Sequence, residues 1–200
     1  MTKRLLSKYS VCKKLRNSYN NLWGIESKDS CRSVLNKKRK KRLTSYSRLL
    51  NIKQSLRLFY PNIGEKLFKC CIKSSIKSPS KTIDKLSSVL ESRIDSIIFR
   101  SCFVTSFQEA RQLINHRFIT VNDNCVTSPG KKIKKGDVIK VNLKFLNKEV
   151  FLKTLSSRSI PNYLELDINN LTIILLWDVN FKNTYYPIKE EYSDVSRYYR

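Results

Sequence analysis

Residues 106–126 read SFQEARQLINHRFITVNDNCV, and this stretch decides the fold. Its first half places apolar residues at helical spacing, with Ala110 and Ile114 on one face. After His116 the pattern alternates as a strand does, and the sequence NDN at 122–124 has the composition of a tight turn. The stretch therefore predicts a short helix that runs directly into a β-hairpin.

The start of this helix carries a recognisable cap. Ser106 and Glu109 have the spacing of a capping box, in which each side chain accepts a hydrogen bond from the backbone N–H of the other residue. The buried face leaves Arg111, Gln112 and Asn115 pointing outward. The unpaired N–H groups of the first turn favour an anion near Ser106, and the Arg111 guanidinium with the Gln112 amide suits the oxygens of a nucleic-acid backbone.

Helical and strand patterns surround this stretch. Residues 43–76 have helical spacing with a break at Pro61, and residues 75–82 have the composition of a linker. The clearest helix is predicted from Ile83 to Phe99, a strand at 138–145, and a second hairpin at 162–177 with Asn169-Asn170 at its tip. The basic residues of the first helical region are expected on its outer faces: Lys53, Arg57, Lys66, Lys69 and Lys73. These elements predict an α+β fold.

Charge is the strongest compositional signal. The chain has 40 Lys+Arg and 16 Asp+Glu, a formal net charge of +24. Residues 1–80 carry 21 basic and 3 acidic side chains, whereas residues 142–200 carry 8 and 7. Such a surface repels itself unless a polyanion neutralises it, so nucleic acid is the first expected partner and an anionic membrane the second. The run LTIILLW at 171–177 has the length of a strand and is too short to span a membrane.

The first 42 residues suggest a basic arm that ends in NKKRKKR at 36–42. Like-charge blocks of this kind stay disordered until a polyanion neutralises them, and a localisation tag or solvated tail is the alternative. Residues 1–22 are basic, contain Ser and lack acid, which suits a mitochondrial presequence or an RNA-binding arm equally. The candidate RNA contacts of the arm are Lys37, Lys38, Arg39, Lys40, Lys41 and Arg42.

Cysteine usage and codon bias complete the composition. The six cysteines form no C-x-x-C pair, and only His116 could join them, so we expect free thiols, no metal and no cofactor. The chain has a single Ala and four Gly but many Lys, Asn, Ile, Tyr and Phe, whose codons are AT-rich. An AT-rich genome such as that of an organelle explains this bias.

Residues 91–139 resemble the RNA-binding module of the S-four family. The matching motifs occur in order: R-I-D at 93–95, S-x-x-x-A-R-Q-L at 106–113, H-x-x-x-x-V-N at 116–122, V-x-x-P at 126–129 and G-D-V-I at 136–139. The flank TSYSRLLNIKQSLRLFY at 44–60 and the tail with NYLELD and SRYYR are similar to those of the small-subunit ribosomal proteins of this family, especially the mitochondrially encoded ones. The family often has Gly where this chain has Arg117 and Asp123, and an Arg where it has Phe107.

The resemblance implies four segments: a basic N-terminal arm at 1–42, a helical N-terminal domain at 43–82, an S-four-type RNA-binding domain at 83–145, and a C-terminal hairpin and tail at 146–200. It implies a ribosomal protein that binds small-subunit rRNA, supports assembly and lies beside the mRNA entry channel and the neighbouring protein of the S-five family. A mitochondrial location is expected, with a plastid or the bacterial cytoplasm as alternatives. The candidate RNA contacts outside the arm are Tyr46, Lys53, Gln54, Arg57, Arg93, Ser106, Arg111, Gln112, His116, Asn122, Lys131, Lys132, Lys134 and Lys135.

Several alternatives stay open from the residues alone. His116 could fill the corner between helix and strand instead of touching RNA, and Arg93 with Asp95 could form a purely structural ion pair. Similar modules occur in modifying enzymes, but those carry a large catalytic domain, so we expect no enzymatic activity. A non-ribosomal RNA-binding factor, acting in ribosome rescue or regulation, is the main alternative.

Overall fold

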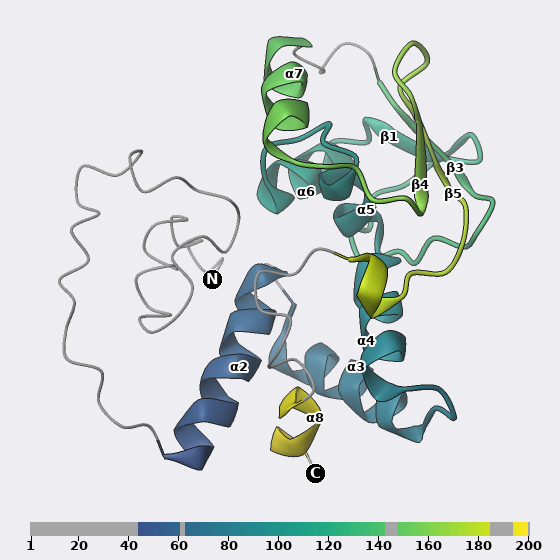
Figure 1. Ribbon diagram of the computed structural model, residues 1–200. Helices are drawn as coiled ribbons and strands as arrows, with labels where there is room; N and C mark the ends of the chain where they lie inside the picture. Colours follow the sequence, from purple (N-terminus) through teal and green to yellow (C-terminus); the bar gives the residue numbers. More distant parts are fainter. Residues whose placement is uncertain (1–43, 61–62, 143–147, 185–193, 200) are drawn as a thin grey trace, which may run out of the picture. The chain divides into compact units, whose positions relative to one another are not determined.

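The computed structural model describes residues 44–60, 63–142, 148–184 and 194–199 (Figure 1). The expected basic arm, with its cations from Lys37 to Arg42, lies outside these residues. The chain divides into two compact units. The first contains the chain up to Cys70 together with the C-terminal residues, and the second runs from Cys71 to Tyr185.

The first unit is helical. Its helix α2 spans Ser45–Phe59 and begins at Thr44, whose Oγ1 accepts a hydrogen bond from the Ser47 N–H at 3.3 Å. Helix α3 begins at Glu65 and extends to Lys77, and the C-terminal helix α8 spans Val195–Tyr198. The predicted break at Pro61 is confirmed, because one helix ends before it and the next begins after it. Apolar side chains from all three helices are buried: Ile52, Leu56, Phe59, Phe68 and Val195.

The second unit combines helices with one antiparallel sheet, as the α+β prediction requires (Figure 1). The five strands have the order β2-β1-β3-β5-β4. Its elements are α4 (Thr82–Glu91), α5 (Ile94–Arg100), α6 (Phe107–Asn115), β1 (Ile119–Val121), β2 (Asn124–Cys125), β3 (Val138–Val141), α7 (Lys148–Ser157), β4 (Leu164–Asp167), β5 (Thr172–Leu175) and η3 (Phe181–Asn183).

The second hairpin belongs to the same sheet as the first. Strand β3 pairs with β1 on one side and with β5 on the other, with Ile139 opposite both Val121 and Ile173. The predicted turn at Asn169-Asn170 is confirmed: the Asp167 carboxylate accepts hydrogen bonds from the Asn169 N–H at 2.9 Å and from the Asn170 Nδ2 at 2.6 Å. The hairpin at 164–175 therefore extends the sheet of the module.

The core of this unit lies between the helices and the sheet. Side chains from both layers have no solvent exposure: Ile94, Ile97, Ile98, Ala110, Ile114, Ile119, Ile139 and Ile173. Removing such side chains from water provides the main stabilisation of a domain of this size. The same burial holds α6 in a fixed position, and this helix carries two of the candidate RNA contacts, Arg111 and Gln112.

The prediction of one helix from Ile83 to Phe99 is wrong, because the chain breaks between α4 and α5. At the break, Arg93 forms a β-bridge with Lys132. The Ile94 N–H donates to the Lys131 carbonyl at 3.0 Å, and the Ile133 N–H donates to the Ser92 carbonyl at 2.8 Å. Buried apolar residues recur at helical spacing on both sides of the break, so periodicity alone could not reveal it: Leu86, Leu90, Ile94, Ile97 and Ile98.

A buried ion pair joins α4 to α5. The Arg100 Nη2 and Nε donate to the two oxygens of Glu91 at 2.6 and 3.1 Å. The Tyr163 hydroxyl, next to β4, donates to the same carboxylate at 3.4 Å. Burial and the Glu91 charge raise the pKa of Tyr163 well above its ordinary value. This network ties the hairpin to the helices through groups that water does not reach.

Among the described residues, no helix combines the length and the apolar character that crossing a membrane requires.

Candidate nucleic-acid interface

Helix α6 presents polar groups on a rigid support. The Ser106 Oγ accepts a hydrogen bond from the Glu109 N–H at 3.3 Å, as the capping box predicts. The Glu109 carboxylate accepts from the Thr105 N–H and hydroxyl, each at 2.7 Å, so the predicted bond from the Ser106 N–H is replaced by one from the preceding residue. Ala110 and Ile114 are buried, and Gln112 is exposed on the opposite side. The helix therefore holds its outer residues at fixed spacing.

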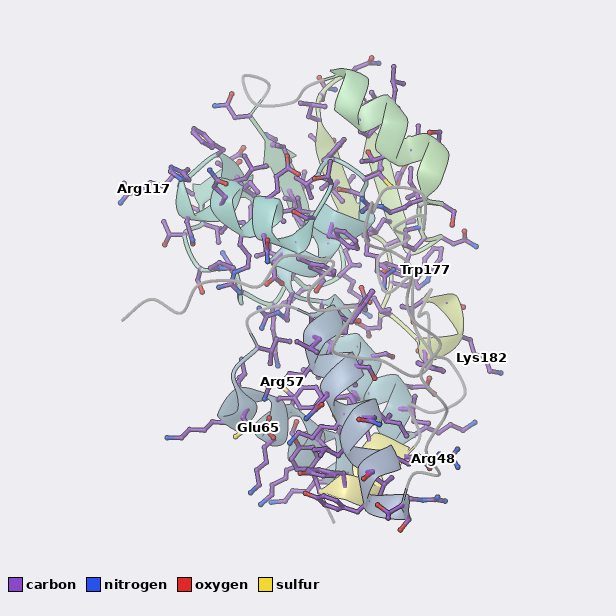
Figure 2. All side chains as sticks on the ribbon, turned by 90° about the vertical axis from the view of Figure 1, so that its left-hand side faces the viewer. Arg48, Arg57, Glu65, Arg117, Trp177 and Lys182 are labelled. Carbon is purple, nitrogen blue, oxygen red and sulfur yellow. The ribbon has the colours of Figure 1, made fainter. Side chains whose placement is uncertain are left out.

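The corner between α6 and β1 carries two exposed basic groups. The His116 ring is exposed and lies parallel to the Phe118 ring, with centroids 6.0 Å apart, so it does not fill the corner. Arg117 has a φ of +64°, the left-handed conformation for which glycine is favoured. Its side chain points away from the module (Figure 2). Arg117 was not among the predicted RNA contacts. Its position, where the family often has Gly, indicates the left-handed backbone conformation but does not indicate an RNA contact.

Arg93, Asp95 and Arg111 form a compact charged group. The Arg93 Nε and Nη2 donate to the two oxygens of Asp95 at 3.0 and 2.7 Å, and the pair is buried. The Arg111 Nη1 lies 3.8 Å from the same Asp95 oxygen. Burial lowers the pKa of the Arg111 guanidinium from its ordinary value, Asp95 opposes this effect and the nearby Arg93 charge adds to it. One carboxylate thus holds two guanidinium groups close together.

The lysine-rich loop joins this group through the backbone. Lys132 pairs with Arg93 in the β-bridge described above, and Ile133 is buried and anchors the loop. Gly130 lies against the guanidinium of Arg93, which an added Cβ would approach at 3.6 Å. The side chains of the four loop lysines are exposed, and none forms an ion pair with a described residue: Lys131, Lys132, Lys134 and Lys135. We call Arg93, Asp95, Arg111, Lys131 and Lys132 the basic cluster.

Asn122 and its neighbours mainly serve the fold. The Asn122 Nδ2 donates to the Asp137 carboxylate at 2.9 Å, and its Oδ1 accepts from the Val138 N–H at 3.0 Å. Lys140 forms an ion pair with Asp123 at 2.6 Å. Asn122 and Asp123 have φ values of +49° and +64°, the left-handed conformation that Asn and Asp adopt in turns. These side chains stabilise the hairpin and direct the adjacent loop.

In the first unit, Glu65 gathers the predicted contacts of α2. Its carboxylate accepts from the Lys53 Nζ at 2.7 Å, from the Arg57 Nη1 at 2.6 Å and from the Tyr199 hydroxyl at 2.6 Å. Burial raises the pKa of Glu65, but these hydrogen bonds outweigh it and lower the pKa to about 2. Figure 2 shows Arg57 and Glu65 beside each other.

The expectation that Lys53 lies on an outer face is wrong. The residue is buried, and its ammonium lies 4.4 Å from the centre of the Tyr198 ring and 5.4 Å from that of Tyr199. Tyr46 and Gln54 are exposed, and the Tyr46 ring lies 6.0 Å from the Tyr198 ring. The C-terminal residues thus cover Lys53 of α2, whereas Tyr46 and Gln54, two of the predicted RNA contacts, remain exposed to solvent.

The structure therefore brings Arg93, Arg111, Lys131 and Lys132 together within the second unit. Gln112, His116, Lys134 and Lys135 are exposed on the same unit. Tyr46, Gln54, Lys53 and Arg57 belong to the first unit. Nothing in this arrangement of the described residues gathers three or more metal-ligating side chains.

Comparisons with known proteins agree with this geometry. The family model described as "S4 domain" matches residues 92–139, which include α5, α6, the first hairpin and the lysine-rich loop. Along its whole length the chain is similar to the small ribosomal subunit protein uS4 of Caulobacter vibrioides, with 30% identity over 206 residues, covering 100% of the chain and 99% of that relative. It is also similar to uS4 of a Chelativorans species, at 30% identity, and of Cereibacter sphaeroides, at 29%, again with 100% of the chain covered.

Proposed function

The chain belongs to the uS4 family of small ribosomal subunit proteins, and on this premise we propose that it is a structural constituent of the small ribosomal subunit that binds small-subunit rRNA directly. The basic cluster is the observation that carries the proposal. It unites α5, α6 and the lysine-rich loop, and it combines four cations with a single carboxylate.

The geometry of the cluster suits the surface of folded RNA. Protein side chains cannot read the deep major groove of an RNA helix, so recognition depends on phosphates, 2′-hydroxyls and shape. Asp95 holds the buried Arg93 through both of its oxygens and lies 3.8 Å from Arg111. The exposed Lys131 and Lys132 are joined to this group through backbone contacts. A guanidinium fork is well matched to phosphate oxygens. Binding and positioning of RNA is therefore the role that these residues serve, without catalysis.

The remaining candidate contacts extend this surface. Gln112 and His116 are exposed on α6 and at its end, and Arg117 adds a further cation at the corner. In the first unit Tyr46, Gln54 and Arg57 are the accessible candidates, whereas Lys53 supports the helix from inside. We assign Asn122 a supporting role, because both polar atoms of its side chain bind within the hairpin.

Full-length similarity favours a ribosomal protein over a rescue or regulatory factor that carries only the module. We place the protein early in assembly of the subunit, near the mRNA entry channel and beside the S-five family member, with mRNA as a further contact. We assign it to the mitochondrial ribosome because of its AT-rich codon bias and its tail. These finer assignments extend the family resemblance.

Binding of the purified full chain to small-subunit rRNA, measured by filter retention at rising salt, tests the proposal. We expect the affinity to fall by about a thousandfold or more over a fourfold rise in salt, as for a protein with roughly six to ten phosphate contacts. Lys132→Gln should weaken binding and reduce the salt slope by about 0.7–0.9. Lys182→Gln, which removes another exposed lysine (Figure 2), is the matched control and should leave the slope unchanged.

Large-subunit rRNA serves as the competitor in the same assay. Equal affinity for the two RNAs, or co-sedimentation with the large subunit only, would contradict the proposal. Retention on small subunits through a high-salt wash would support it.

A further inference from the structure

One surface of this basic protein lacks basic residues. We call residues 161–181, which contain β4, β5 and the following turn, the hairpin surface. It carries Glu165, Asp167 and Asp178 and no Lys or Arg, although the chain has 40 Lys+Arg in 200 residues. Among the described residues none of these three carboxylates forms an ion pair, and unpaired carboxylates repel phosphate. The hairpin surface is therefore unsuited to the RNA contact proposed for the rest of the module.

Strand β4 is an edge of the five-stranded sheet. The Leu176 N–H donates to the Tyr163 carbonyl at 3.0 Å, which identifies this as a hydrogen-bonded pair. Pairs alternate along an antiparallel ladder, so Leu166, which lies opposite Ile173, is in a non-hydrogen-bonded pair. Its N–H and C=O groups therefore point away from β5. Within the described residues neither group has a partner.

Large apolar side chains are exposed at both ends of the β4–β5 hairpin. Leu176 and Trp177, opposite the start of β4, are 39% and 44% exposed, and Ile168, just after its end, is 54% exposed. Trp177 is marked in Figure 2. Exposed Trp beside a polar rim is typical of protein interfaces. Natural edge strands are usually protected by shortness, charged side chains, a Pro or a bulge. Strand β4 is four residues long and carries Glu165 and Asp167, which oppose pairing with an acidic strand and leave the edge open to a basic one.

The charges of the hairpin surface determine which kind of partner can bind there. A second copy of β4 would bring Glu165 and Asp167 against the same residues, and like charges across paired strands are destabilising. RNA would meet three carboxylates. An extended protein segment with Lys or Arg would pair with the carboxylates and satisfy the free backbone groups.

We propose that β4 is a docking edge for an extended, Lys- or Arg-bearing segment of another protein, which adds to the sheet as a strand and places an apolar side chain against Leu176 and Trp177. This inference rests on the proposed function, which makes the partner another component of the small subunit. The protein then has two binding surfaces of opposite charge: the basic cluster binds RNA, and the hairpin surface binds protein.

The test places a photo-reactive residue in the full chain, as Trp177→p-benzoylphenylalanine. The labelled protein is combined with total small-subunit protein, both with and without small-subunit rRNA, irradiated, and its crosslinked peptides are identified by mass spectrometry. We expect a crosslink to a protein segment that carries Lys or Arg, in both arms. The same label at Asn124→p-benzoylphenylalanine, on the opposite edge strand β2, is the positional control and should not reach that segment.

A second pair of variants tests the backbone edge. Leu166→Pro removes only the N–H that points away from β5, which an edge strand tolerates, and we expect the crosslink yield from position 177 to fall about tenfold. Leu166→Ala shortens the same side chain but keeps the N–H, and it should retain most of the crosslink. The rRNA affinity of both variants should stay within about twofold of the parent, because the hairpin surface lies outside the basic cluster.

Several results would overturn the inference. These are a crosslink from position 177 to rRNA or to a second copy of the chain, a crosslink to a segment without basic residues, and no protein crosslink in either arm. An equal loss of yield in the Pro and Ala variants would also refute strand addition. If the chain fails to bind rRNA but crosslinks to a basic segment in the arm without rRNA, the proposed function fails while the docking edge is supported.

Discussion

Arg111→Ala should weaken binding to small-subunit rRNA far more than it weakens the fold. The Arg111 Nη1 lies 3.8 Å from the Asp95 carboxylate, and its side chain is 25% exposed. Arg93 already donates to both oxygens of that carboxylate. The Arg111 guanidinium makes no hydrogen bond to a described residue, and Asp95 is the one described residue with which it forms an ion pair. Its donors are therefore available to a ligand.

The magnitude follows from these contacts. A hydrogen bond to a charged group contributes about 1.5–3 kcal/mol, which corresponds to a loss of roughly 10- to 150-fold in rRNA affinity. A partly exposed ion pair at this distance contributes about 0.2–1 kcal/mol to stability. Arg111→Ala should therefore reduce the free energy of unfolding by less than about 1 kcal/mol, and the effect on binding should dominate.

Filter binding at several salt concentrations, together with urea unfolding, measures both quantities. Arg111→Ala should also reduce the salt slope by about 0.7–0.9, since one phosphate contact is lost. Arg111→Lys keeps the charge but not the planar fork, so it should weaken binding while leaving the slope near that of the parent. Lys182→Ala is the matched control for loss of an exposed cation.

Two outcomes would refute this reasoning. If Arg111→Ala binds within about twofold of the parent at an unchanged salt slope, Arg111 does not contact phosphate. If the unfolding free energy falls by more than about 3 kcal/mol, the residue supports the fold through its contact with Asp95.

Substitutions centred on three further residues, Glu65, Glu91 and Ser106, test how the structure is held together. Glu65→Gln should lower stability by about 1–2 kcal/mol at neutral pH, a value reduced for screening because the carboxylate is 42% exposed. The folded-state pKa of Glu65 is about 2, below its ordinary 4.5, so in urea titrations this difference should be full above about pH 4.5 and disappear as the pH falls towards 2. Glu91→Gln should cost about 3–5 kcal/mol in thermal unfolding, because it leaves the buried Arg100 charge unpaired. The joint change Glu91→Leu with Arg100→Met should cost less, about 1–2 kcal/mol, because it removes that charge but leaves the Tyr163 hydroxyl without its acceptor. Ser106→Ala should cost about 1 kcal/mol through loss of the helix cap, and Ser106→Gly a few tenths.

For each of these three predictions, a specific result would contradict it. A Glu65→Gln difference that persists at pH 2 would show that the lowered pKa of Glu65 is not its source. Equal losses for Glu91→Gln and for the joint change would mean that packing, and not the unpaired charge, sets the cost. A loss that is the same for Ser106→Ala and Ser106→Gly would contradict a capping role for Ser106.

Local sequence signals predicted much of the fold correctly. The cap at Ser106, the helix after it, the break at Pro61 and the turn at Asn169-Asn170 all appear in the structure. Each depends on groups only a few residues apart in the chain, so the sequence contains nearly all the information that is needed. The motifs of the RNA-binding module also fell within the region that matches the S4 domain.

The errors share a different origin. The break before Ile94 depends on backbone bonds to Lys131 and Ile133, more than thirty-five positions along the chain. The burial of Lys53 depends on Tyr198 and Tyr199 at the C-terminal end. The free edge of β4 depends on which strand lies at the margin of the sheet. No local pattern could indicate these features.

The sequence by itself determined the helix and hairpin of the module, the excess of positive charge and the family resemblance. These follow from side-chain period, turn chemistry and composition, which act over short distances along the chain. The tertiary structure decided which cations remain available: Asp95 binds the buried Arg93 and leaves the donors of Arg111 available, while Glu65 and the C-terminal tyrosines enclose Lys53. The physical reason is that the availability of a charge depends on the groups that surround it in space, and distant parts of the chain supply those groups.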